Sequence, residues 1–293
     1  ACGLLADGLL VQIHQNAVRL CVPINVAQSE GVPMSSPSCS SWGPDNMSIS
    51  LGAVGHNVIA VATSSPCVLF ILGIRSLSTY CYEIIQMQQV RLQNELSCIS
   101  IPSRHLEHRS LPSQMNFRNT SPAVGLPSGV DINNAIIIGT HKPSVEVLSF
   151  SPDTGLQILA IGTISLTNTM GTIISGCVPQ DVRLVLVDRL YILSGLRNGM
   201  LLRFEWPPDS AISPSDYTVM GSCWVNSLGS AMFTPPSNRG SLRSFSSFLE
   251  KTRDSFPVHL QLIAVRRIGI TPAFLVPLSD YLDADIIALS DRP

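Results

Sequence analysis

One strand–turn–strand pattern recurs along the chain, and it constrains the fold more than any other feature. A short apolar run is followed by a small or polar turn and then, except in the last copy, by a second apolar run. The copies are Leu9–Val22, Val58–Leu72, Ala135–Phe150, Tyr191–Phe204 and Ile286–Pro293, the last of which stops at its turn. Self-similarity of this kind is typical of stacked or circular repeat proteins.

The spacing of the copies is close to one repeat length. One residue in each turn serves for alignment, namely Asn16, Pro66, Pro143, Gly199 and Pro293, and the intervals are 50, 77, 56 and 94 residues. The two long intervals contain stretches rich in Ser, Pro, Arg and Asn, which we interpret as loop insertions at 103–130 and 207–256. Without about 27 and about 45 inserted residues, every interval is near the length of a propeller blade with its loops.

The residues of each copy suit β-sheet. The first strand is almost entirely apolar, as in Ile136–Ile138, which indicates burial on both faces, whereas the second strand alternates more. Small residues, Ala62, Gly139 and Gly195, are expected to close the first strands where the chain turns. One hairpin cannot bury both its faces, but hairpins packed face to face around a ring can. We predict an all-β, WD-repeat-like β-propeller, a partial ring of about four blades, with residues 1–293 part of one domain.

Outer strands and two candidate helices complete the prediction. Leu96–Ile101 reads as the first strand of a blade, Leu156–Ile164 as a last strand and Arg183–Val187 as the next first strand. Tyr80–Asn94 fits three helical turns or strand-and-turn equally well, and a short helix is expected around Ser244–Arg253.

Composition bounds the class of protein. Hydrophobic residues make up 45% of the 293 residues and charged residues 13%, enough apolar material for a large core. The net charge of −2 shows no basic bias, so any nucleic acid is expected to be held indirectly, through a whole assembly. The eight cysteines include no C-x-x-C pair, which predicts buried, reduced thiols.

Two uncharged stretches are long enough to span a bilayer, Met47–Ile74 and Thr154–Gln180. Both are interrupted by polar residues and proline, and both are rich in Val, Ile and Thr, which suits pleated sheet better than helix. We therefore expect no membrane insertion.

Motifs for catalysis or metal binding are weak. Gly171 and Gly176 have the glycine spacing of a phosphate-binding loop but lack its lysine, so a strand-end turn is expected. The His105/His108 pair has no second pair to complete a zinc site, and the acidic group Asp280, Asp283 and Asp285 lacks the glycine and glutamate of a calcium loop. We expect no enzyme activity, no cofactor, no metal and no small-molecule substrate.

Candidate interaction residues combine basic, amide and aromatic side chains. They are Arg197, Asn198, Arg203, Trp206, Arg243, Phe245 and Phe248. Base stacking on nucleic acid requires aromatics interleaved with basic residues, and Arg203–Trp206 is the nearest approach to that pattern. A blade strand with Phe204 in the core and Arg203 exposed is the simpler interpretation. His141 is expected to be an exposed polar residue in a hairpin turn.

Several of these stretches occur in an order that resembles a known family. They are Val11–Ile13, Ala17–Leu20, Glu95–Ile99, Gly195–Phe204 and Ala288–Pro293. Their order is similar to the middle portion of the large triple-propeller proteins. These include the large subunit of the UV-damaged-DNA-binding complex, the A subunit of the cleavage and polyadenylation specificity factor, and the matching subunit of splicing factor 3b. The two insertions depart from the family pattern.

The resemblance implies a piece of the second propeller of a nuclear scaffold. Its partners would be protein subunits of a large complex in pre-mRNA splicing or 3′-end cleavage and polyadenylation, with RNA or DNA contacted indirectly. Two alternatives stay open, an adaptor of a cullin-RING ubiquitin ligase in DNA repair and a propeller enzyme. Because the chain begins at Ala1 and its last copy stops at a turn, we also expect a segment from mid-protein that forms an open arc and aggregates when expressed alone.

Overall fold

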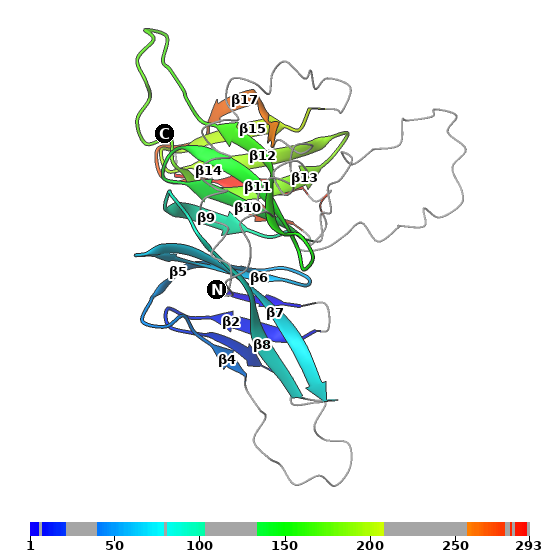
Figure 1. Ribbon diagram of the computed structural model, residues 1–293. Coiled ribbons are helices and arrows are strands. Elements are labelled where there is room, and N and C mark those ends of the chain that lie inside the picture. Colours follow the sequence, from blue (N-terminus) through cyan, green and yellow to red (C-terminus); the bar gives the residue numbers. More distant parts are fainter. Residues whose placement is uncertain are drawn as a thin grey trace, which may run out of the picture.

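The computed structural model describes residues 1–5, 8–21, 40–78, 81–102, 134–207, 257–278, 282 and 285–291 (Figure 1). The regular elements named within these ranges are all β-strands, and consecutive strands form antiparallel sheets. Within each sheet the spatial order of the strands follows the chain order, apart from one added edge strand.

The strands group into blades as follows. Blade 1 contains β1 (Cys2–Leu4), β2 (Leu10–Ile13), β3 (Val18–Cys21) and β4 (Ser41–Trp42). Blade 2 contains β5 (Ile49–Val54), β6 (Ile59–Ser64), β7 (Cys67–Ser78) and β8 (Cys81–Arg91). Blade 3 contains β9 (Leu96–Ser100), β10 (Ala135–Thr140), β11 (Ser144–Ser151) and β12 (Gly155–Thr163). Blade 4 contains β13 (Pro179–Leu186), β14 (Leu190–Leu196), β15 (Met200–Glu205) and β17 (Gln261–Arg267). A two-stranded sheet of β18 (Phe274–Pro277) and β19 (Ile286–Leu289) follows.

The first strand of each sheet lies against the first strand of the next. β1 contacts β5, β5 contacts β9, β9 contacts β13, and β13 contacts β18. In Figure 1 the blue sheet β1–β4 is followed by the cyan sheet β5–β8 and then by the green, yellow-green and orange strands of blades 3 and 4. Sheets of four antiparallel strands that meet along their first strands are the blades of a β-propeller, so the predicted fold class is confirmed.

The hydrophobic core lies between neighbouring blades. One cluster joins blades 1 and 2, a second joins blades 2 and 3, and a third joins blades 3 and 4. Successive residues of a central strand enter different clusters, because side chains alternate between the two faces. Ile136 and Ile138 of β10 face blade 2, whereas Ile137 between them faces blade 4. This double burial explains the unbroken apolar runs that the sequence repeats.

The recurring hairpin corresponds to the second and third strands of a blade. Its complete copies are β2–β3, β6–β7, β10–β11 and β14–β15, and the final copy begins with β19. The predicted outer strands at Leu96–Ile101, Leu156–Ile164 and Arg183–Val187 are present as β9, β12 and β13. The helical alternative for Tyr80–Asn94 is wrong. That stretch contains β8, which pairs with β7 along its length and so satisfies its backbone groups in a sheet.

The small residues Gly139 and Gly195 have a different role from the one predicted. Both lie inside strands rather than in a tight turn. A Cβ added at Gly139 would lie 2.5 Å from Cβ of Pro179 on β13, and one at Gly195 would lie 2.3 Å from the Ala273 carbonyl oxygen before β18. These positions are small because the neighbouring blade approaches closely.

The chain after residue 256 links blades 3 and 4. β16 (Val258–His259) adds to blade 3 in parallel with β12, and the Leu260 amide donates to the Ile161 carbonyl at 2.9 Å. β17 then forms the outer strand of blade 4 by pairing with β15. The predicted insertion at 103–130, residues 208–256 of the predicted insertion at 207–256, and the predicted helix at Ser244–Arg253 lie outside the described residues.

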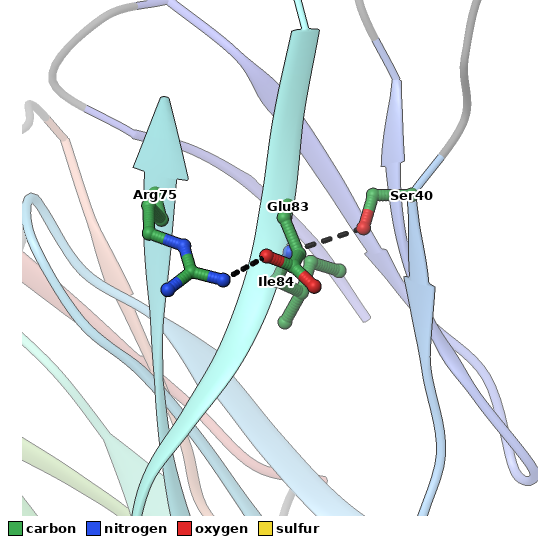
Figure 2. A network of polar contacts seen from close by, with 4 residues as sticks. All are labelled: Ser40, Arg75, Glu83 and Ile84. Atoms are coloured by element: carbon green, nitrogen blue, oxygen red, sulfur yellow. Dashed lines mark hydrogen bonds and ion pairs between the residues drawn. The ribbon is translucent and has the colours of Figure 1, made fainter. Parts of the chain in front are cut away.

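Blades 1 and 2 are also joined at their outer strands. Just before β4, Ser40 accepts a hydrogen bond through Oγ from the Ile84 amide of β8 at 3.0 Å (Figure 2). Beside it, Arg75 of β7 pairs with Glu83 of β8, with 2.5 Å between Nη2 and Oε2 (Figure 2). Trp42 of β4 packs edge-on against Phe70 of β7, with ring centroids 5.1 Å apart.

The six described cysteines are free thiols, but fewer are buried than the sequence predicted. Cys98 and Cys177 are buried, Cys21, Cys67 and Cys81 are half-buried, and Cys2 is exposed. Burial raises the pKa of the Cys98 thiol to about 12, which suppresses the nucleophilic thiolate form. As for the two long uncharged stretches, no helix within the described ranges is long and apolar enough to cross a bilayer.

Candidate functional site

The two edges of the blades carry different connections. At one edge, which we call the turn edge, lie the tight turns between second and third strands and the links from one blade to the next. At the opposite edge, the insertion edge, the first strand joins the second and the third joins the fourth. Every connection of the turn edge between β1 and β19 is described, and every internal gap in the description falls in a connection of the insertion edge.

The turn of blade 4, Arg197–Gly199, is held by both neighbouring links. The Arg197 amide donates to the Val178 carbonyl at 2.9 Å, and the Gly199 carbonyl accepts from Ile268 at 3.0 Å and from Gly269 at 3.2 Å. Gly199 has a φ of 76°, and a Cβ there would lie 2.2 Å from the Gly269 oxygen. Glycine is required because the backbone is left-handed and the next link passes directly over it.

Asn198, a predicted interaction residue, makes its described side-chain hydrogen bonds within the chain itself. Its Nδ2 donates to the Ser175 carbonyl at 3.1 Å, and its Oδ1 accepts from the Met200 amide at 3.3 Å. Its carbonyl accepts from Arg267 Nη1 at 3.3 Å. The side chain is half-buried, so its described contacts position the turn.

Arg197 stands beside the turn of blade 3. Its Nη2 lies 3.5 Å from Nε2 of His141, and Lys142 follows in the same turn. This turn is fixed to the link before it, because the His141 amide donates to the Glu95 carbonyl at 2.9 Å. His141 is exposed in a hairpin turn, as predicted.

These residues form a group of basic side chains that we call the basic cluster. Its members are His141, Lys142, Arg197 and Arg267, all exposed and contributed by the turn-edge ends of blades 3 and 4. Arg267 Nη1 donates to backbone carbonyls of Asn198 and Gly269. Within the described part of the chain, none of the four forms an ion pair with a carboxylate. Lys142 and Arg267 were not predicted from the sequence, although Lys142 is one of only two lysines and lies in a recurring turn.

Arg203 and Trp206 lie away from this cluster. The Arg203 guanidinium is exposed and stacks on Tyr191, with 4.9 Å between Cζ and the ring centroid. The Tyr191 hydroxyl donates to Oδ1 of Asp188 at 2.8 Å. Phe204 is fully buried, as the simpler interpretation expected. Trp206 is also a core residue with 4% of its surface exposed, so it has little surface to offer to a partner.

The remaining predicted residues divide into two groups. Arg243, Phe245 and Phe248 lie outside the described residues, as do His105, His108, Asp280 and Asp283. The glycine pair Gly171 and Gly176 is described, and both residues have a positive φ in the link between blades 3 and 4. Oδ1 of Asn168 accepts from the amides of Met170 and Thr172, both at 2.9 Å, so this stretch is the expected turn.

Clustered metal ligands and buried acidic groups among the described residues also bear on what the site can bind. In the parts of the chain that the structure describes, no three His, Cys, Asp or Glu side chains gather as a metal site would require. Asp181 of β13 is enclosed, and burial raises the pKa of its carboxyl. Its Oδ2 accepts from the Leu275 amide at 2.9 Å, so this carboxylate attaches β18 to blade 4.

Comparison with known proteins identifies no close relative. No family model matches the chain, and no curated protein matches it. Among solved structures, the chain is similar to Chaetomium thermophilum Sqt1 bound to the N-terminus of ribosomal protein L10, with a TM-score of 0.37 and 11% identity. That match covers 68% of this chain and 43% of the Sqt1 chain, so this chain spans less than half of that protein. It is also similar to the β-propeller domain of Myceliophteria thermophila Cps50 (Swd1), with a TM-score of 0.36 and 9% identity over 91% of this chain and 70% of the other.

Proposed function

We propose that this chain is a non-catalytic propeller scaffold that binds an acidic segment of a partner protein through the basic cluster. The observation that carries the proposal is the convergence of four exposed cationic or ionisable side chains from two neighbouring blades, without a described carboxylate to pair with them. Binding surfaces are commonly carried on loops that a rigid scaffold positions.

The rigid backbone beneath the basic cluster favours a binding role. The turns that carry the cluster are fixed by backbone hydrogen bonds to the links beside them, including those of Arg197 and His141. Side chains on a preorganised backbone lose less conformational entropy on binding than side chains on a free loop. Complementary charge also accelerates encounter with an acidic partner.

The finer proposal is a role in a nuclear complex for pre-mRNA splicing or 3′-end processing. Its support is the order of the short motifs, including Gly195–Phe204, which contains the turn of blade 4. Nucleic acid would be held by the assembly rather than by this chain, because the net charge is −2 and the basic cluster is small.

Matched charge variants test the proposal. Lys142→Gln combined with Arg197→Gln removes two positive charges from the basic cluster, whereas Arg75→Gln combined with Arg189→Gln removes the same charge from the opposite edge. Fluorescence anisotropy of a labelled oligoglutamate peptide should show about tenfold weaker binding for the first variant and an unchanged affinity for the second. Equal losses in both variants would count against a specific cluster.

Two further measurements address the finer proposal. Affinity purification from nuclear extract should retain subunits of a pre-mRNA processing complex on the wild type and on the Arg75/Arg189 variant, but not on the Lys142/Arg197 variant. Salt titrations with single-stranded RNA and with duplex DNA should show weak, salt-sensitive binding. Tight, salt-insensitive binding to either would overturn the indirect role of nucleic acid.

A further inference from the structure

A small pocket lies between blades 2 and 3, beside the turn edge. Its apolar wall includes Leu92 of the link between the blades, Leu96 of β9, and Ile138 and Leu148 of blade 3. Polar side chains complete the lining, namely Arg91, Gln93, Asn94, Thr140 and Glu146. Its interior volume is about 30 Å³, room for one or two water molecules. The one acidic side chain among the described lining residues is Glu146 of β11.

Glu146 is 3% exposed, and burying a carboxyl in apolar surroundings is costly. Its neighbours Val145 and Val147 face blade 4, so Glu146 points toward blade 2, the direction that Leu148 also takes. Leucine or valine would suit this position if packing were its only role. The carboxyl therefore requires another explanation.

Hydroxyl groups hold this carboxyl in place. Ser144 Oγ donates to Oε1 of Glu146 at 3.0 Å and lies 2.7 Å from Oγ1 of Thr140, which donates to the Lys142 carbonyl. Burial raises the pKa of Glu146 to about 7, against the lowering effects of Ser144 and Lys142. No described cation forms an ion pair with it. Lys142, in the adjacent turn, acts on it electrostatically, and Arg91 lines the pocket from β8.

We propose that this pocket receives the ammonium group of a lysine side chain from a partner protein. An ammonium group is about the size of a water molecule, so the pocket has room for it, and Glu146 supplies the opposite charge. A guanidinium is wider, and the described lining contains no aromatic ring of the kind that binds a trimethylated lysine. The inference rests on the proposed function only in requiring a protein partner.

The probe for this site is Nα-acetyl-lysine N-methylamide, compared with the matching norleucine, arginine and trimethyl-lysine compounds. The readout is the ¹³Cδ NMR signal of Glu146 in glutamate-labelled protein, assigned by its loss in Glu146→Gln. At about pH 8, where the carboxyl is ionised, the lysine compound should shift this signal saturably, and at about pH 5 the shift should be lost. An equal shift from the norleucine compound would overturn the proposal.

Variants separate this site from the basic cluster. Glu146→Gln should weaken binding of the lysine compound at least about tenfold, whereas Glu83→Gln, at an exposed carboxylate, should leave it unchanged. Arg197→Gln should weaken binding of the oligoglutamate peptide but leave binding of the lysine compound unchanged, so the two proposals can fail separately. Unchanged affinity in Glu146→Gln, or no shift of the wild-type Glu146 signal, would overturn the lysine pocket.

Discussion

The turn edge and the insertion edge are built from the same strands but differ in how closely they are packed. At the turn edge, a Cβ added to Gly199 would lie 2.2 Å from the Gly269 oxygen. At the insertion edge, a Cβ added to Gly8, which has almost the same φ of 74°, would meet nothing within 4 Å. The blade 4 turn at Gly199 is therefore closely packed against the next link, whereas the connection at Gly8 has room for added atoms.

The largest contrast is expected from a single methyl group placed at each edge. Gly8→Ala should cost about 1 kcal/mol, the strain of a left-handed backbone alone. Gly199→Ala adds a collision with the backbone of the next link and should cost about 4 kcal/mol. Urea unfolding monitored by circular dichroism measures both values.

A third variant separates strain from packing at the turn edge itself. Gly171 has a φ of 74° with no atom near its added Cβ, so Gly171→Ala should resemble Gly8→Ala. If Gly199→Ala proved no worse than these two, the close packing of the blade 4 turn would carry little free energy.

The second contrast concerns two glutamates. Glu146 is buried near the turn edge with its pKa raised from 4.5 to about 7, so the folded protein binds more protons there than the unfolded chain between these values. Stability should therefore fall as the pH rises through this window, by roughly 3 kcal/mol in total. Glu146→Gln should match the wild type near pH 5 and exceed its stability by roughly 2–3 kcal/mol near pH 8.

The matched residue at the insertion edge is Glu83, which pairs with Arg75 on the surface (Figure 2). Glu83→Gln should change the free energy of unfolding by at most about 0.5 kcal/mol, with no comparable dependence on pH. Thermal melts of the three proteins across this pH range provide the test. A wild-type stability that rises between pH 5 and pH 8, relative to Glu146→Gln, would contradict the assignment.

The third contrast compares side chains that support turns. Asn198→Ala removes the bonds to the Ser175 carbonyl and the Met200 amide and should cost about 1–2 kcal/mol. At the insertion edge, Ser151 accepts one bond from the Asp153 amide at 3.4 Å, and Ser151→Ala should cost a few tenths of a kcal/mol, about 0.3. Guanidinium unfolding at fixed pH measures both, and equal losses would mean that the two edges are supported alike.

The blades were predictable from sequence because each hairpin repeats its own pattern of apolar residues. The unbroken apolar run Ile136–Ile138 predicted burial on both faces, and in the structure its successive residues pack against blades 2 and 4. The strand β8 was ambiguous, because Tyr80–Asn94 has apolar residues near helical spacing and only pairing with β7 decides its conformation. The close approach at Gly139 depends on Pro179, forty residues away, and no local pattern shows it.

The candidate site was predictable only in part. Arg197 was among the predicted interaction residues, but Lys142 lies beside it only through the packing of blade 4 on blade 3, and Arg267 only through the pairing of β15 with β17. Glu146 lies in the second strand of its hairpin, for which the sequence predicted only an alternation of apolar and polar residues. In the structure both faces of β11 are covered, so an outward position on one hairpin becomes an interior position between two blades.

The last contrast concerns the largest change in sequence, which should nevertheless have only a small effect. Glu205 of β15 pairs with Gln261 of β17, so the strand ends that flank residues 208–254 lie close together. Replacing these residues with a Gly/Ser linker of about six residues should raise the free energy of unfolding by about 1 kcal/mol, because a shorter loop costs less entropy to close. Residues 255–293 are kept, since Leu260 is buried between blades 3 and 4. Oligoglutamate binding by the basic cluster should be unchanged. A loss of stability larger than that of Asn198→Ala would mean that the insertion edge, too, is packed against the fold, and the contrast between the edges would be wrong.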